Sequence, residues 1–296
     1  MRPGGAVGGS GGDRTPGADR TGGAAGAPRA STAVFALLGS PVAHSLSPAI
    51  HNAAFAAAGL DAVYVALACA AASVEPLMRA LAEAGGGGNV TLPHKAAAFA
   101  ALDRPTDAAR ATGACNTFWA EDGALAGDNT DVDGFGAAAR TLLDPWPDDG
   151  SARVLGAGGA ARAASYWLGR AGWRVVVEGR TPERVAELVG ALGMPAVRAA
   201  GGEAAGCDLL VNATPLGLDP ADPPPLEDAR LAEVGGVLDM AYAASPNALE
   251  RAARERGVPY ADGREMLVRQ AAAAWPRWFG RDAPIRAMRG ALGDAT

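Results

Sequence analysis

The chain has 296 residues, which is long enough for a sizeable core and about two domains. Hydrophobic residues make up 49% and charged residues 20%, as in ordinary soluble globular proteins, and the net charge of −6 provides no basic field for nucleic acid or an anionic membrane. Three widely spaced cysteines and three isolated histidines form neither a disulfide framework nor a metal-ligand pattern, so we expect a cytoplasmic protein without a metal.

The first 31 residues are dominated by glycine, with proline, alanine and scattered charges. Such a segment cannot bury enough apolar surface to offset the entropy lost on ordering, so we expect a disordered tail over residues 1–31. The tail lacks the continuous apolar stretch of a secretory signal. The chain also has no run of about 18 apolar residues that would predict a membrane helix.

Alternating strand and helix patterns begin after the tail. The predicted strands and helices of this first part cover residues 33–38, 48–58, 61–68, 73–84 and 89–91. Ser47 followed by Pro48 is a strong helix start signal, so one interpretation of Ser47 is an N-cap alone. The other is that Ser45 and Ser47, two hydroxyls beside the positive end of a helix, form an anion site suited to a carboxylate. The spacing does not decide between these interpretations.

The stretch from Asn89 to Lys95 reads NVTLPHK and places polar side chains at a strand-to-helix corner. Strand side chains alternate, so Asn89 and Thr91 point the same way, and Lys95 opens the next helix. Lys95 is also the only lysine among the 26 Lys and Arg residues. Arg keeps its proton, whereas a partly desolvated Lys can donate and accept one, so we predict a concave site with an acid–base lysine. The alternative is a chance surface lysine beside a turn in which Asn and Thr satisfy backbone groups.

The next stretch contains two motifs, GACNT (113–117) and GDNTD (127–131), with a predicted hairpin around Asp122 and Gly123 between them. Thr130 is positioned to cap the following helix, with Asp131 in its first turn, where the helix dipole favours acidic residues. This position alone explains Asp131 as a helix-stabilising residue. The Pro- and Gly-rich stretch 145–150 is predicted to be a linker.

A glycine-rich turn between a strand and a helix dominates the second half. Strand 153–155 runs into GAGGAAR, which is followed by a helix to about residue 171 and by strand 174–178. This G-x-G-x-x-A arrangement brings a pyrophosphate against backbone N–H groups at a helix N-terminus. We therefore predict dinucleotide binding, rather than a merely glycine-rich turn, at Gly156, Gly158, Gly159 and Ala160.

The end of strand 174–178 indicates which dinucleotide is bound. An acidic residue there binds the ribose 2′-hydroxyl of NAD, whereas arginines hold the 2′-phosphate of NADP. Arg180 and Arg184, one helical turn apart, form a phosphate clamp, but Glu178 stands beside it. The pattern favours NADP and leaves NAD open.

Two more buried strands, 207–211 and 236–240, place their carboxyl ends at the cleft of a doubly wound sheet. A final helix opens at Gly263 and carries Gln270, the only glutamine of the chain. Its aromatic residues Trp275, Trp278 and Phe279 are predicted to be core residues. Five of the six asparagines fall within the motifs, which favours hydrogen bonding to a polyhydroxylated ligand; they are Asn52, Asn89, Asn116, Asn129 and Asn212.

Together the motifs resemble the shikimate dehydrogenase family, over essentially everything from about Val34 to the C-terminal helices. The segments that carry the resemblance share the family's order and approximate spacing, and they are GSPVAHSLSPAIHN (39–52), NVTLPHK (89–95), GACNT (113–117), GDNTD (127–131), GAGGAAR (156–162), NATPLG (212–217), Asp239 to Tyr242 and Gly263 to Gln270. The resemblance implies an α/β protein of two domains. Residues 32–130 and 263–292 are expected to form the substrate domain, and residues 131–262 a Rossmann-like, doubly wound NADP-binding domain.

The resemblance also implies an activity and a role for each matched residue. The expected reaction is reversible NADPH-dependent reduction of 3-dehydroshikimate to shikimate, on the way to chorismate and aromatic amino acids, in a monomer or homodimer. Lys95 and Asp131 match the catalytic pair, in which the lysine exchanges a proton with the oxygen at C3 and the aspartate holds the ammonium. The matched substrate-binding positions are Ser45, Ser47, Asn89, Thr91, Asn116, Tyr242 and Gln270. The matched cofactor positions are Gly156, Gly158, Gly159, Ala160, Arg180, Thr181, Arg184, Thr214, Met240 and Gly263.

The sequence departs from the family pattern at one place: Gly179 replaces the usual Asn before Arg180, and Glu178 precedes it. This keeps an NAD-preferring quinate/shikimate dehydrogenase as the alternative within the enzyme class. A remote alternative is a non-catalytic dinucleotide-binding regulator, and the intact Lys95 and Asp131 argue against it. The proline-rich stretch 219–226 has no explanation from the sequence.

Overall fold

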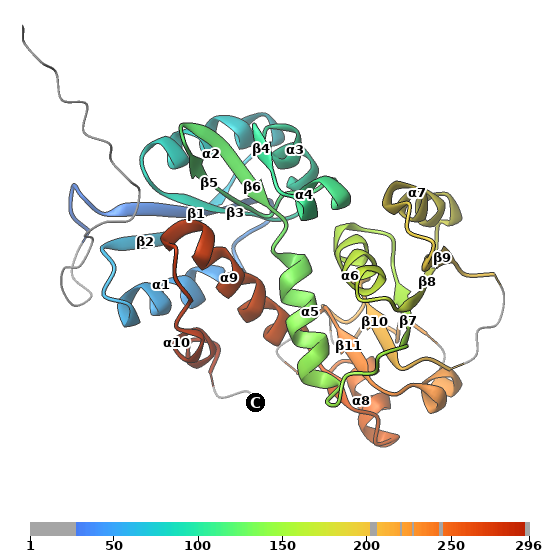
Figure 1. Ribbon diagram of the computed structural model, residues 1–296. Coiled ribbons are helices and arrows are strands. Elements are labelled where there is room, and N and C mark those ends of the chain that lie inside the picture. Colours follow the sequence, from blue (N-terminus) through green and yellow to red (C-terminus); the bar gives the residue numbers. More distant parts are fainter. Residues whose placement is uncertain (1–27, 202–205, 220, 227, 243–244, 294–296) are drawn as a thin grey trace, which may run out of the picture.

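The computed structural model describes residues 28–201, 206–219, 221–226, 228–242 and 245–293. Of the tail predicted over residues 1–31, residues 1–27 therefore lie outside the described part. The described chain folds around two six-stranded sheets, and two helices that lie side by side separate them (Figure 1). None of the helices in these ranges combines the length and the apolar character that crossing a membrane requires.

The first sheet contains mostly predicted strands. Its members are β1 (Ala33–Gly39), β2 (Ala62–Ala68), β3 (Gly87–Val90), β4 (Arg104–Pro105), β5 (Thr117–Glu121) and β6 (Ala124–Asp128). They lie in the order β2-β1-β3-β5-β6-β4. β1 is parallel to β2 and β3, whereas β5 runs antiparallel to both β3 and β6. β3 and β6 therefore point the same way, and their carboxyl ends lie at the same edge of the sheet.

Glycine lets β3 lie close to its neighbours. The sequence predicted this strand over residues 89–91. In the structure β3 begins two residues earlier, at Gly87, and ends at Val90. A Cβ on Gly88 would lie 2.1 Å from the carbonyl oxygen of Ala36 and 2.9 Å from the ring of Phe118. Only a residue without a side chain fits this approach.

Helices cover both faces of the first sheet. The first helices along the chain are α1 (Ser47–Ala57), the 3₁₀ turn η1 (Ala71–Ser73), α2 (Val74–Glu83), α3 (Lys95–Ala100) and α4 (Asp107–Thr112). Ala36 and Leu38 of β1 pack against α2 and α3. Phe35 and Leu37 face the other side, where α1 packs with α9 (Gly263–Phe279) and α10 (Ile285–Gly290).

The second sheet is parallel throughout, as predicted for a doubly wound fold. Its strands are β7 (Ser151–Leu155), β8 (Arg174–Glu178), β9 (Val197–Ala199), β10 (Leu209–Asn212), β11 (Val237–Asp239) and β12 (Tyr260–Ala261), in the order β12-β11-β10-β7-β8-β9. The chain passes from β7 outward to β9 and returns to β10 on the other side of β7. In such sheets the ligand crevice lies at the carboxyl ends of the strands where this reversal occurs.

Different helices cover the two faces of the second sheet (Figure 1). One face carries α5 (Asp131–Leu142), α6 (Gly159–Arg170) and α7 (Pro182–Leu192), packed on Val154 and Val177. The other face carries the 3₁₀ segment η2 (Asp228–Glu233) and α8 (Ala248–Glu255), where Leu231 and Leu249 pack on Leu155. Neighbouring residues of one strand therefore face different helices.

Helices α5 and α9 connect the cores of the two sheets. On α9, Met266 belongs to the core of the second sheet and Trp275 to that of the first, so Trp275 is a core residue as predicted. A Cβ on Gly134 of α5 would lie 2.7–3.0 Å from Cβ, N and Cα of Gln270 on α9. This glycine lets the helices approach closely and brings the start of α5 next to Gln270.

His51 is a buried titratable residue without a polar partner. It lies on α1, fully buried, with its ring stacked on Tyr64 at a centroid distance of 4.4 Å. Neither ring nitrogen has a hydrogen-bond partner in the described part of the chain. Because burial disfavours the charged imidazolium, the pKa of His51 falls from 6.5 to about 3.

This burial makes the folded protein sensitive to acid, and His51→Phe should remove that sensitivity. The contribution of neutral His51 to the free energy of unfolding is intact above pH 6.5. It is lost as the pH falls towards 3, because the unfolded chain takes up a proton that the folded chain excludes. The loss reaches about 2 kcal/mol at pH 5. Urea titrations of the wild type and the variant at pH 7 and pH 5 measure this loss. From pH 7 to pH 5 the free energy of unfolding should fall by about 2 kcal/mol less in the variant than in the wild type. His44→Phe, at an exposed histidine, is the matched control and should behave like the wild type.

Candidate active site

Lys95 and Asp131 meet at the edge where β3 and β6 end. Lys95 is the first residue of α3 and Asp131 the first residue of α5, 36 positions later. The Lys95 ammonium donates a hydrogen bond to Asp131 Oδ2. The side chains are 21% and 10% exposed, so the ion pair is partly shielded from water but still reachable. The predicted pair is thus brought together by the parallel direction of the two strands.

Asn116 holds the carboxylate of Asp131 from the other side. Its Nδ2 donates to Asp131 Oδ1 at 2.8 Å, and its Oδ1 accepts from the backbone N–H of Thr130 at 2.8 Å. The same Nδ2 lies 3.4 Å from Gln270 Oε1 on α9. Asp131 is therefore oriented by an amide on one oxygen and by the Lys95 ammonium on the other.

The predicted cap of α5 does not form. Thr130 occupies the N-cap position, but its backbone is helical, with φ −69° and ψ −6°, and its hydroxyl does not bond the helix. The hydroxyl contacts Thr117 Oγ1 at 2.9 Å and Asn116 Oδ1 at 3.1 Å. Thr130 thus ties the start of α5 to β5.

Asn89 lies behind the ion pair, on β3. Its Nδ2 donates to the carbonyl of Asn116 at 3.0 Å and to Thr117 Oγ1 at 2.9 Å, while its Oδ1 accepts from the Tyr64 hydroxyl at 2.7 Å. Asn52 in turn bonds the backbone of Tyr64 through both ends of its amide. The sequence predicted ligand contacts for these amides but missed this internal role, which the position of Asn89 within a buried strand could have indicated.

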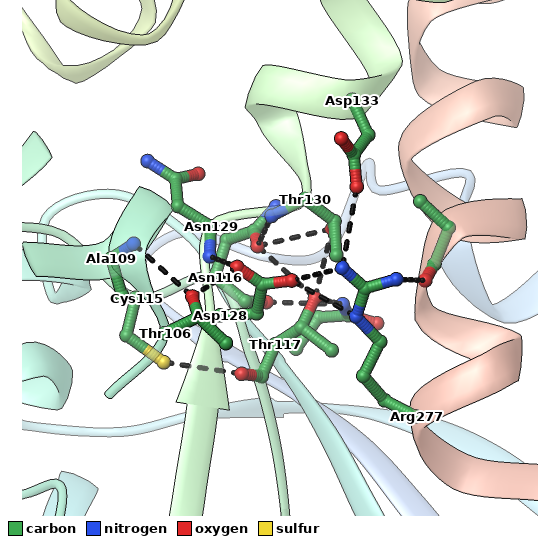
Figure 2. Close-up of polar contacts among 12 residues, drawn as sticks. Thr106, Ala109, Cys115, Asn116, Thr117, Asp128, Asn129, Thr130, Asp133 and Arg277 are labelled. Carbon is green, nitrogen blue, oxygen red and sulfur yellow. Dashed lines mark hydrogen bonds and ion pairs between the residues drawn. The ribbon is translucent and has the colours of Figure 1, made fainter. Parts of the chain in front are cut away.

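Figure 2 shows a buried ion pair next to this group, between Asp128 at the end of β6 and Arg277 on α9. Asp128 is 2% exposed, and its Oδ2 accepts from Arg277 Nε at 2.9 Å and Nη2 at 2.6 Å. Its Oδ1 accepts from the hydroxyl of Thr106 and from the backbone N–H of Asn129 at 2.7 Å. The pair anchors α9 to the turn that carries Asp131. Sequence reasoning did not find it, although Asp128 lies inside GDNTD.

The loop after β1, which leads to Ser45 and Ser47, borders the loop after β3, which leads to Lys95. The backbone N–H of Ser40 donates to the carbonyl of Leu92 at 3.0 Å, and a Cβ on Gly39 would lie 2.4 Å from the methyl of Thr91. The helix α1 begins at Ser47, one residue earlier than predicted, and the hydroxyl that accepts a backbone N–H there belongs to Ser45, at 3.2 Å from Ser47 N. The interpretation of Ser47 as an N-cap is therefore wrong.

Tyr242 lies against the start of α9. A Cβ on Gly263 would lie 3.1 Å from its ring, and burial raises the pKa of Tyr242. Within the described residues no hydrogen bond joins Tyr242, Ser45 or Ser47 to Lys95 or Asp131.

The glycine turn after β7 has the geometry that a dinucleotide phosphate needs. Gly156 has φ +116°, and a Cβ there would lie 2.7 Å from the carbonyl oxygen of Ala213, so a side chain is excluded. Gly158 and Gly159 begin α6, and a Cβ on either would meet nothing within 4 Å. Ala160 follows in the first turn. The backbone N–H groups at this helix start are open to an approaching anion.

The predicted phosphate clamp is exposed and unpaired. Arg180, Thr181 and Arg184 at the start of α7 are exposed, and neither arginine has an ion pair or side-chain hydrogen bond within the described residues. Glu178 is not aimed at them. Its carboxylate accepts from Arg153 of β7 at 2.7 Å and from Arg230 of η2 at 2.8 and 3.1 Å. The sequence did not predict these partners.

Thr214, Met240 and Gly263 lie along the neighbouring strand ends. Thr214 donates to Asn212 Oδ1 through its hydroxyl at 2.7 Å and its backbone N–H at 3.1 Å. The N–H of Met240 donates to the Asn212 carbonyl at 2.9 Å, and a Cβ on Gly263 would lie 2.5 Å from the Met240 carbonyl oxygen. The three predicted cofactor residues thus share one edge with the glycine turn.

Comparison with known proteins identifies relatives over nearly the whole chain. The shikimate dehydrogenase substrate binding domain matches residues 37–118, and the shikimate 5′-dehydrogenase C-terminal domain matches residues 263–292. The shikimate dehydrogenase (NADP(+)) of Moorella thermoacetica is 41% identical over 282 residues, which cover 90% of this chain and 95% of that protein.

Solved structures agree with this relationship. A shikimate dehydrogenase in complex with NADP+ has a TM-score of 0.82 at 32% identity, covering 90% of this chain and 96% of that one. The enzyme of Thermus thermophilus in complex with NADP(H) and shikimate has a TM-score of 0.79 at 38% identity, covering 89% and 99%. A quinate dehydrogenase of Corynebacterium glutamicum in complex with NAD has a TM-score of 0.79 at 29% identity, covering 88% and 98%. The chain belongs to the shikimate dehydrogenase family.

Proposed function

We propose that this protein catalyses the reversible NADPH-dependent reduction of 3-dehydroshikimate to shikimate, in the cytoplasm, as a monomer or homodimer. The product leads to chorismate and the aromatic amino acids. The observation that carries the proposal is the contact between the Lys95 ammonium and the Asp131 carboxylate at the edge of the first sheet. The relatives named NADP-dependent shikimate dehydrogenases support it.

Lys95 is the proton donor in this proposal. When bound, NADPH supplies a hydride to the C3 carbonyl carbon of the substrate. The Lys95 ammonium gives a proton to the carbonyl oxygen, so the carbonyl becomes a secondary alcohol, and the neutral amine takes the proton back in the reverse direction. Asp131 keeps the ammonium in place, and Asn116 keeps Asp131 in place.

The remaining residues bind the two ligands. We assign residues 32–130 and 263–292 to the substrate domain and residues 131–262 to the cofactor domain. The substrate carboxylate is held by Ser45, Ser47 and Tyr242, and its ring hydroxyls by Thr91, Asn116 and Gln270, with Asn89 behind them. The cofactor is held by the glycine turn, by Arg180, Thr181 and Arg184 around the start of α7, and by Thr214, Met240 and Gly263.

NADP is favoured over NAD because of where the charges at the end of β8 lie. The carboxylate of Glu178 is engaged by Arg153 and Arg230, so it is not free to accept a ribose hydroxyl. Arg180 and Arg184 are exposed cations without protein partners among the described residues, as a 2′-phosphate site requires. These observations count against the NAD-preferring quinate dehydrogenase as the alternative.

An assay of shikimate or quinate with NADP or NAD tests the proposal. The reaction is monitored by the absorbance of the reduced cofactor. We expect the highest kcat/KM for shikimate with NADP. Absence of NADP reduction, under conditions where calorimetry detects binding of both ligands, would refute the catalytic assignment. Faster turnover of quinate with NAD would establish the alternative.

Arg180→Ala should weaken NADPH selectively. Loss of a charge-assisted contact to the 2′-phosphate costs about 1.5–3 kcal/mol, which corresponds to roughly a 10- to 100-fold rise in KM for NADPH. NADH lacks this phosphate, so its KM should change little. Arg174→Ala, at an exposed arginine where β8 begins, is the matched control and should change neither value. Equal losses with both cofactors in Arg180→Ala would argue against the clamp.

A further inference from the structure

Glu178 sits between two guanidinium groups at the end of β8. Arg153 Nη1 lies 2.7 Å from its Oε1, and Arg230 Nη2 lies 2.8 Å from Oε1 and 3.1 Å from Oε2. The side chains of Arg153 and Glu178 are 6% and 21% exposed, so both charges are largely removed from water. The carboxylate of Glu178 is thus neutralised by two guanidinium groups.

Strand alternation directs the side chain of Glu178 away from the phosphate clamp, and its bonds to Arg153 and Arg230 hold the carboxylate there. Val177 packs into the core shared with α7, so the next side chain points to the opposite face of the sheet, where η2 lies. Gly179 follows with no side chain, and a Cβ there would lie 2.8 Å from Val185 Cγ2 of α7. The end of β8 therefore offers no carboxylate on the face of Arg180.

Arg230 reaches Glu178 from a segment 52 positions further along the chain. Its neighbour Leu231 is buried with Leu226 in the core of that face, which fixes the position of η2. Arg230 therefore lies four residues beyond the unexplained proline-rich stretch 219–226 and contacts Glu178 at the end of β8. The Arg230 side chain is 38% exposed, so it can be replaced with little loss of packing.

We propose that Arg230 is a positioning residue for cofactor choice: together with Arg153 it holds Glu178 on the far face of the sheet and neutralises it, so that the site accepts the 2′-phosphate of NADPH. Without Arg230, Glu178 keeps one cation and gains freedom to turn towards the ribose. A carboxylate there repels a doubly charged phosphate and can accept the 2′-hydroxyl of NADH. This inference rests on the proposed NADP site but not on turnover.

Fluorescence titration of NADPH and NADH tests the inference with four proteins: the wild type, Arg230→Ala, Glu178→Gln and the double variant. Arg230→Ala should raise the Kd for NADPH about five- to tenfold at low salt and leave the Kd for NADH unchanged or lower. In the Glu178→Gln background the same substitution should have no effect, because the repelling charge is gone. Arg230→Lys should restore most of the NADPH affinity.

Three results would overturn the inference. Equal weakening of both cofactors by Arg230→Ala would indicate a structural role. Loss of NADPH affinity that persists in the Glu178→Gln background would show that Arg230 contacts the cofactor itself. An unchanged NADPH affinity would show that Arg153 alone controls Glu178. A wild type that binds NADPH but does not reduce 3-dehydroshikimate would refute the proposed reaction and leave these titrations interpretable.

Discussion

Replacing Lys95 with alanine is expected to lower kcat about 10²- to 10⁴-fold while leaving much of the affinity for shikimate. The Lys95 ammonium is the hydrogen-bond donor to Asp131 Oδ2 and the proton source of the proposed reaction. Its proton transfer occurs only in the transition state, so the loss falls on kcat more than on KM. Steady-state rates and calorimetric binding of shikimate separate the two effects.

Lys95→Arg is the sharper control for the same site. The guanidinium keeps a positive charge next to Asp131, so the affinity for the substrate can be retained. It does not release a proton at working pH. We expect binding close to that of the wild type and a kcat as low as that of the alanine variant. A near-normal kcat in either variant would show that the proton comes from elsewhere.

Arg277→Leu is expected to lower the free energy of unfolding by about 3–5 kcal/mol. Asp128 is 2% exposed, and Arg277 supplies the cationic hydrogen bonds to its Oδ2. The substitution leaves a buried carboxylate without its countercharge, which costs much more than the net value of the intact pair. Urea denaturation followed by circular dichroism measures the loss.

Two further variants identify the cause of this loss. Arg281→Leu removes an exposed arginine of the same C-terminal region and should change stability by less than about 0.5 kcal/mol. Adding Asp128→Asn to Arg277→Leu removes the buried charge and should recover part of the loss. A loss below about 1 kcal/mol in Arg277→Leu would mean that water reaches Asp128 and the ion pair is weak.

Local patterns were sufficient for many of the elements, whereas the pairing of Lys95 with Asp131 was predicted from the family resemblance. The strand-to-helix corners at Lys95 and Asp131 could be located because each follows a short strand and opens a helix. The glycine turn at Gly156 was predicted from the G-x-G-x-x-A motif between a strand and a helix, and the positive φ and close backbone approach there explain why glycine is needed. These features depend on residues that are close together in the sequence, so they can be predicted from short sequence patterns.

Contacts between distant segments could not be predicted in the same way. The partners Asp128 and Arg277 are 149 positions apart, and their meeting depends on how α9 lies along α5. Glu178 could have been assigned to a face by alternation with Val177, but its partner Arg230 belongs to a stretch without periodicity. The hydroxyl at the start of α1 belongs to Ser45 because Leu46 already has helical dihedrals, φ −83° and ψ −7°, which the Ser-Pro signal did not reveal.

The packing of α9 and α10 onto β1 also bears on how the protein is made. Phe35 and Leu37 complete their core only with Trp275 of α9 and Met288 of α10. During synthesis the strands of the first sheet leave the ribosome early, but Phe35 and Leu37 of β1 lack their partners on α9 and α10 until residues near 288 have been added. The second sheet, built from strands between Ser151 and Ala261, can close before that. The sheet that is translated first is therefore completed last.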